Sequence, residues 1–119
     1  MGMARSVSAV LGAVYLVIGV VGFVVDGPLF GLFDVNELLN LIHVVIGGVL
    51  LYGATVTSTA IRVSRRVGIV LIIVGLLGFV AADGFGIMPL GGNDIWLHLS
   101  TGAILLANGV FETDDVPSA

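Results

Sequence analysis

The chain has 119 residues, of which 58% are hydrophobic and only 10% are charged. A soluble domain is about 25% charged, so this composition excludes an ordinary water-soluble surface and predicts a protein of the lipid bilayer. The eight carboxylates outnumber the four cations, all arginine, which disfavours nucleic-acid binding because no basic stripe can neutralise phosphates. The absence of cysteine excludes disulfides and thiolate metal sites. An acidic chain without lysine also indicates a halophile-like composition.

Four apolar runs predict four transmembrane helices, at residues 7–25, 38–57, 67–82 and 95–111. The first run would form a helix of about 28 Å, close to the hydrocarbon thickness of about 30 Å. The third run is short, and we expect its helix to begin a few residues earlier, with Arg65 and Arg66 reaching the headgroups. The predicted fold is therefore all-α: one polytopic four-helix transmembrane domain over residues 1–119.

The arginines predict the orientation of these helices. They precede the first run or lie between the second and third runs, at Arg5, Arg62, Arg65 and Arg66. The loops 26–37 and 83–94 carry carboxylates and no cation. By the positive-inside rule, we expect a multi-pass protein of the cell membrane with both termini in the cytoplasm. Residues 112–119 are predicted to form a short acidic cytoplasmic tail.

An internal repeat links the two halves of the sequence. Four residues recur 56 positions later, as Gly12, Gly19, Gly22 and Phe23 and then as Gly68, Gly75, Gly78 and Phe79. A second set recurs 55 positions later, as His43, Gly47, Leu50 and Leu51 and then as His98, Gly102, Leu105 and Leu106. We therefore predict two parallel two-helix repeats, related by an axis along the membrane normal.

The repeated glycines predict where helices approach closely, since glycine lets two membrane helices bring their backbones together. The predicted packing residues are Gly12, Gly19, Gly22, Gly47, Gly68, Gly75, Gly78 and Gly102. We expect these seams to face the bundle interior or a neighbouring subunit.

A polar stripe crosses the second and fourth helices at helical spacing. We call this set the polar stripe: Asn36, Asn40, His43, Asp94, His98 and Thr101. Polar groups within a membrane must face protein or a cavity, so these residues are the candidate site.

Three interpretations of the polar stripe remain open. In the first, Asn40 and His43 form hydrogen bonds between helices, while Asp94 caps the fourth helix and holds His98. In the second, His43 and His98 bind a cofactor, either a haem iron or a metal ion. Two ligands are too few for a closed zinc site unless Asp94 or Glu37 joins them. In the third, the histidines handle protons or a small solute from the outer face.

Two segments resemble those of a known family. Residues 40–47 read N-x-x-H-x-x-x-G, and residues 93–102 place Asn-Asp before Leu-His. They are similar to the segments that open helices 2 and 4 in a prokaryotic, including haloarchaeal, four-helix integral membrane protein family of unknown function. The resemblance covers roughly residues 7–110 and departs at Ile95, where the family often has Asn. It implies the four-helix fold and no established activity.

The sequence favours a small non-enzymatic membrane protein, structural or accessory to a partner. Its predicted partners are the lipid bilayer and either a second copy or a larger membrane complex. We expect no catalytic residues and no cofactor. The alternative is a haem- or metal-binding redox component, or a proton or small-solute transporter, using His43 and His98.

Overall fold

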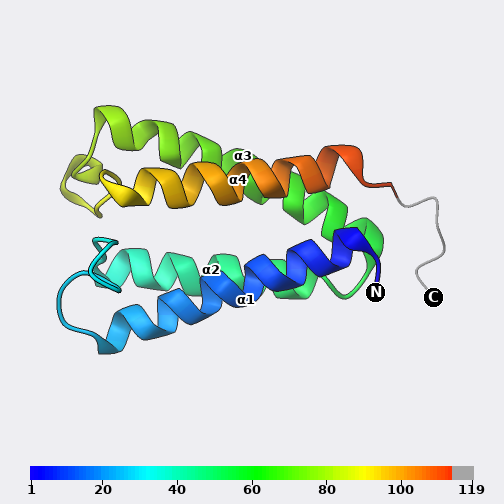
Figure 1. The fold of residues 1–119 in the computed structure, drawn as a ribbon, viewed down its shortest axis with the longest axis horizontal. Coiled ribbons are helices and arrows are strands. Elements are labelled where there is room, and N and C mark those ends of the chain that lie inside the picture. Colours follow the sequence, from blue (N-terminus) through cyan, green and yellow to red (C-terminus); the bar gives the residue numbers. More distant parts are fainter. Residues whose placement is uncertain (114–119) are drawn as a thin grey trace.

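The chain folds as an all-α bundle in the computed structural model, which describes residues 1–113 (Figure 1). These residues form the α-helices α1 (Met3–Val24), α2 (Glu37–Gly53), α3 (Thr57–Val80) and α4 (Asn93–Phe111), and the 3₁₀ helix η1 (Gly84–Gly86). The predicted all-α helical bundle is confirmed. Residues 114–119, most of the predicted acidic tail, lie outside the described residues.

Two antiparallel helical hairpins make up the bundle, because α1 packs mainly against α2 and α3 mainly against α4. Figure 1 shows the two hairpins lying side by side, with their long axes roughly parallel. We call the end formed by residues 25–36 and 81–92 the loop end, on the left of the figure. The opposite end carries Met1, the α2–α3 connection and the end of α4, and we call it the turn end.

The helix bounds differ from the predicted runs at several ends. Helix α3 begins at Thr57, so the run 67–82 missed its first turns, which hold three of the four arginines. That run required uncharged residues, whereas arginine is a good helix former and does not interrupt a helix. Helix α2 ends at Gly53 rather than at Thr57 because the chain turns at once into α3.

Helices α1 and α3 are long and apolar enough to cross a membrane, and α2 is a shorter apolar helix. Large apolar side chains also stand exposed along the bundle surface, among them Val10, Val17, Val45, Ile69 and Ile73. Such exposure is costly in water and favourable in lipid. Both observations are consistent with membrane association.

The core of the bundle is apolar near its middle. Tyr15, Leu50, Leu71 and Leu105 are almost completely buried there, two from each hairpin. At the turn end, the Arg5 guanidinium donates to the Ala54 carbonyl at 2.7 Å. That contact places a cation at the C-terminus of α2, where it stabilises the helix dipole.

Candidate functional site

The two histidines of the chain face each other in the bundle core. His43 on α2 and His98 on α4 are each only 2% exposed, and their ring centroids lie 5.9 Å apart. Each sits on the inward face of its helix, where buried residues recur every three to four positions. The structure therefore brings together the two residues that the sequence identified as candidate cofactor ligands.

Three of the four ring nitrogens of this pair are buried without a hydrogen-bond partner within residues 1–113. Both nitrogens of His43 and the Nδ1 of His98 are buried without a partner among the described residues. The first interpretation of the polar stripe is therefore wrong for His43, which bonds to no other helix. An unpartnered buried polar group costs about 1–3 kcal/mol. These nitrogens therefore form no hydrogen bond to the described residues that would stabilise the fold.

Asp94 lies one turn before His98 on α4 and is 1% exposed. Neither of its carboxylate oxygens accepts a hydrogen bond within residues 1–113, so the predicted contact with His98 is not formed. The predicted capping role is also wrong, because Gly92 occupies the cap position. Gly92 has φ of 64°, a conformation that glycine adopts without strain, and Asp94 falls inside the first turn.

Tyr15 completes the site and was missed by the sequence reasoning. Its ring packs edge-on against His43 with centroids 5.5 Å apart. Its hydroxyl lies 2.6 Å from Thr101 Oγ1, which itself bonds the Leu97 carbonyl at 2.6 Å. Because Thr101 uses its only proton on that carbonyl, Tyr15 must donate to Thr101. A phenol within the uncharged run 7–25 was the available signal.

The remaining members of the polar stripe lie toward the loop end. Asn36 caps α2, since its side chain accepts from the Leu39 amide at 2.9 Å and donates to the Ile87 carbonyl at 2.8 Å. The second bond ties one hairpin to the loop of the other. Asn40 is 2% exposed, lies against Gly22, and has an Oδ1 without a partner.

Further hydrogen bonds between helices form at the turn end, where the sequence reasoning placed none. Asn108 on α4 donates to the Ala4 carbonyl at 3.0 Å and to Ser64 Oγ at 2.9 Å. Ser8 on α1 donates to the Leu50 carbonyl at 2.7 Å. These hydrogen bonds at the turn end contrast with the histidine pair, of which three ring nitrogens have no partner within residues 1–113.

The predicted packing glycines lie between the two helices of each hairpin. A Cβ at Gly12 would lie 3.0 Å from the Gly47 carbonyl, and a Cβ at Gly68 would lie 2.8 Å from the Gly102 carbonyl. Gly19 and Gly75 face residues of α2 and α4 in the same way, and Gly22 and Gly78 face Asn40 and Ile95. Both hairpins therefore bring their backbones together at glycine.

The ligand count around the histidines is low. No group of three or more His, Asp or Glu side chains within residues 1–113 is placed to hold a metal ion. A closed zinc site would need Asp94 or Glu37 as a ligand beside the two histidines. Neither carboxylate joins them in such a group. The arrangement offers two imidazole donors and a separate carboxylate.

Comparison with known proteins gives one family. A domain of unknown function, DUF4383, matches residues 5–111, which is nearly the whole described chain. Searches of curated proteins and of solved structures give no match. The predicted membership in a family of unknown function is confirmed, while the two motif segments remain predictions. The chain belongs to the DUF4383 family.

Proposed function

We propose that the chain is a four-pass membrane protein with both termini in the cytoplasm. At about 1.5 Å per residue, α2 and α4 span roughly 25–29 Å, close to the bilayer core. The four arginines belong to the N-terminus and α3, toward the turn end, whereas both loop-end connections carry carboxylates. This distribution supports a cytoplasmic turn end.

A reporter that is active only in the cytoplasm tests the orientation when it is fused after Ala119. The proposal requires activity from that fusion and none from a fusion in the loop after Asp83. The reverse pattern would invert the orientation, and activity at both positions would rule out a helix α4 that crosses the membrane.

We further propose that the two hairpins are copies of one ancestral unit, as the internal repeat predicts. The matching glycine contacts of Gly12 with Gly47 and of Gly68 with Gly102 support this. So do Gly27 and Gly84, which both follow an aspartate and adopt positive φ, 79° and 60°. The duplication would place the two histidines at equivalent positions on either side of the axis.

For the function itself, we propose a non-enzymatic binding protein whose core holds one small cation between His43 and His98. The observation that carries this is the facing pair of buried imidazoles with unpartnered nitrogens. Metal–imidazole bonds are about 2 Å long, so two rings facing at this separation can share one ion. Neutral imidazole is also the commonest metal ligand in proteins.

The charge balance of the site favours a monovalent ion that is content with two ligands. Cu(I) has this chemistry, and imidazole is among the ligands that suit copper. A single positive charge would be balanced by Asp94, whose buried carboxylate has no other partner. A zinc ion would require at least one further ligand.

Haem and transport fit the geometry less well than ion binding. Tyr15 packs against His43 and bonds Thr101, so side chains occupy the space that a macrocycle would need. Transport requires a route past the pair toward the turn end. Leu50 and Leu105 are fully buried on that side, and both come two turns after a histidine.

Anaerobic titration of the purified, metal-depleted protein with Cu(I), against a coloured Cu(I) chelator, tests this function. We expect one ion per chain, lost in His43→Leu and in His98→Leu and weakened in Asp94→Asn. Met88→Leu serves as the control, because thioether sulfur also binds Cu(I), and should keep the site. A parent protein that binds no copper, or histidine variants that still bind it, would contradict the proposal. A Soret band in the untreated protein would favour haem instead.

A further inference from the structure

An acidic pocket at the loop end lies outside the histidine site. It has a volume of about 440 Å³, within the range of small-molecule sites. Three carboxylates line it, those of Asp26, Asp34 and Glu37, and none of its lining residues is basic. A ligand for this pocket must therefore be neutral or positively charged.

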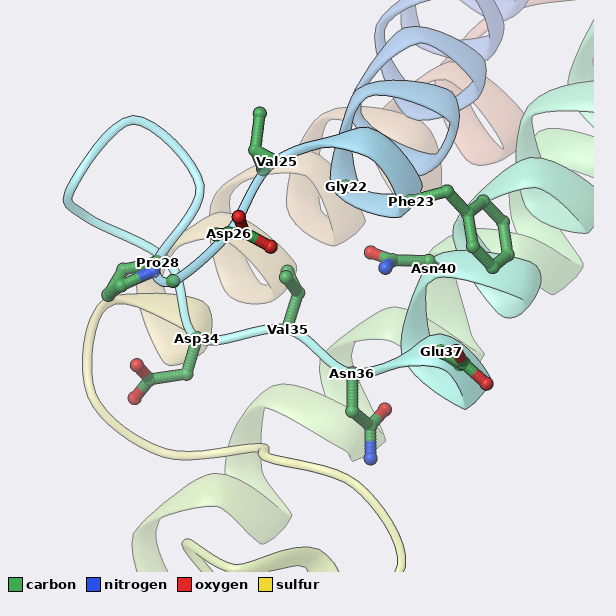
Figure 2. A pocket seen from close by; sticks show the side chains of 11 residues that line it. Gly22, Phe23, Val25, Asp26, Pro28, Asp34, Val35, Asn36, Glu37 and Asn40 are labelled. Atoms are coloured by element: carbon green, nitrogen blue, oxygen red, sulfur yellow. The ribbon is translucent and has the colours of Figure 1, made fainter.

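Asn40 points into this pocket from the buried face of α2. Figure 2 shows its carboxamide and the Asp26 carboxylate directed toward each other across the space, with Val35 between them on the lower side. Asn40 is 2% exposed, and its Oδ1 has no hydrogen-bond partner in residues 1–113. A donor group in the pocket would satisfy this oxygen and remove the cost of leaving it unpaired.

The packing of the bundle does not require asparagine at this position. Asn40 lies against Gly22 of α1, whereas in the second hairpin the Leu90 carbonyl and the Ile95 side chain together lie against Gly78 of α3. An apolar side chain therefore suits the equivalent contact there. The second hairpin thus has no polar group at the position that corresponds to Asn40, so close packing alone does not explain the carboxamide.

The loop that closes the pocket is held in place. Leu29 is 1% exposed, and its amide donates to the Phe33 carbonyl at 2.8 Å. This tight turn lies between Asp26 and Asp34, so it fixes both acidic ends of the loop beside α2. The pocket is thus formed before any ligand arrives.

We propose that this pocket binds the ammonium group of a small organic cation between Asp26 and Asn40. The carboxylate supplies the opposite charge and the amide oxygen accepts an N–H bond, which together recognise a protonated amine. A metal ion fits less well, because the described residues place no three acidic or imidazole groups around one point. The amine is either a free solute or the headgroup of an ethanolamine lipid, since both present the same group at this end of the bundle.

Calorimetric titration of the full chain in detergent with ethanolamine tests the pocket. We expect saturable binding at one site, weakened about tenfold or more in both Asp26→Asn and Asn40→Ile. Asn40→Ile copies the residue of the second hairpin, and its melting temperature checks that it folds. Asp83→Asn removes the same charge from the other loop and keeps the acceptor for Phe85, so it should change the affinity less than about twofold.

Two further probes separate an N–H-recognising site from a general acidic surface. Tetramethylammonium has the charge but no N–H donor, and Ca²⁺ has charge without a directional donor, so both should bind more weakly than ethanolamine. Equal binding of either ion, an equal loss in Asp26→Asn and Asp83→Asn, or no saturable binding at all would overturn the proposal. These results leave copper binding untouched, so the two proposals fail independently.

The source of the amine is decided in bilayers. With an ethanolamine lipid present, a headgroup that occupies the pocket should lower the affinity for added ethanolamine, and Asp26→Asn should remove that difference. An affinity equal to that in bilayers of phosphatidylglycerol alone would assign the site to a free amine.

Discussion

The two hairpins share their packing and differ in their polar side chains. Both bring glycines of one helix against the backbone of the next, at Gly12 with Gly47 and at Gly68 with Gly102. Yet the first hairpin buries the polar residues Tyr15 and Asn40. The residues 56 and 55 positions later in the second hairpin are the buried apolar Leu71 and Ile95. The shared glycines set how closely the two helices of each hairpin pack. The features that differ surround the histidines and the acidic pocket, so we infer that they serve binding.

The largest effect is expected from overpacking the first hairpin. A Cβ at Gly19 would lie 2.8 Å from both the Asn40 carbonyl oxygen and the Val44 amide nitrogen, whereas one at Gly75 meets mainly the flexible Leu99 side chain. Gly19→Leu should therefore lower the free energy of unfolding by about 3 kcal/mol, and Gly75→Leu by less. Thermal and denaturant unfolding in detergent measure both. If both variants melt like the parent, the seams do not hold the bundle together.

A smaller change tests the same contact with a neighbouring control. Gly47→Ala would place a Cβ 2.7 Å from the Gly12 carbonyl and against the Leu16 backbone, so we expect a loss of about 1–3 kcal/mol. Gly48 has nothing within 4 Å of its Cβ position. Gly48→Ala should therefore be neutral or stabilise by up to about 1 kcal/mol, through helix propensity. Equal behaviour of the two variants would contradict the close approach.

Tyr15→Phe tests the polar asymmetry between the hairpins. It removes the hydrogen bond to Thr101 and keeps the ring beside His43, so unfolding should become easier by about 1 kcal/mol. Leu71→Ile, a similarly mild change at the position that matches Tyr15 in the second hairpin, is the control for repacking. An unchanged stability of Tyr15→Phe would mean that the hydroxyl contributes nothing to the fold.

The smallest effect is expected at the histidines, and its sign is informative. Because the His43 nitrogens have no partners, His43→Leu should leave the metal-free protein as stable as the parent or more stable. Asn108→Leu, by contrast, breaks two hydrogen bonds and should cost about 1–3 kcal/mol. Chemical unfolding of both metal-free variants makes the comparison. A large loss in His43→Leu would assign the histidine a structural role.

Periodicity and composition predict much of this fold and only part of the site. The all-α class follows from the apolar runs, and the spacing of His43 and His98 on their helices placed both on inward faces. We expected α3 to begin a few residues before the run 67–82, and its start at Thr57 lies further back because the arginines of its first turns do not interrupt a helix. Tyr15 escaped because a single phenol in an apolar run has no spacing partner in the sequence.

The distance between the histidines could not be predicted, since it depends on how one hairpin stacks on the other. The same holds for the acidic pocket, which combines a buried residue of α2 with a loop whose shape the tight turn at Leu29 and Phe33 decides. The Asp94 cap failed for a local reason, because Gly92 adopts the positive φ that ends the preceding loop. Local patterns give elements and faces, whereas contacts between hairpins come from the tertiary fold.

The most direct test of the account is magnetic resonance of the bilayer-embedded protein with isotope label in histidine alone. The chain has two histidines, so every labelled signal belongs to His43 or His98. The facing arrangement, with ring centroids 5.9 Å apart, requires a ring-to-ring contact between the two residues, and Cu(I) should shift both sets of signals together. Two histidines without a mutual contact, or a response to Cu(I) in neither ring, would contradict the proposed binding site.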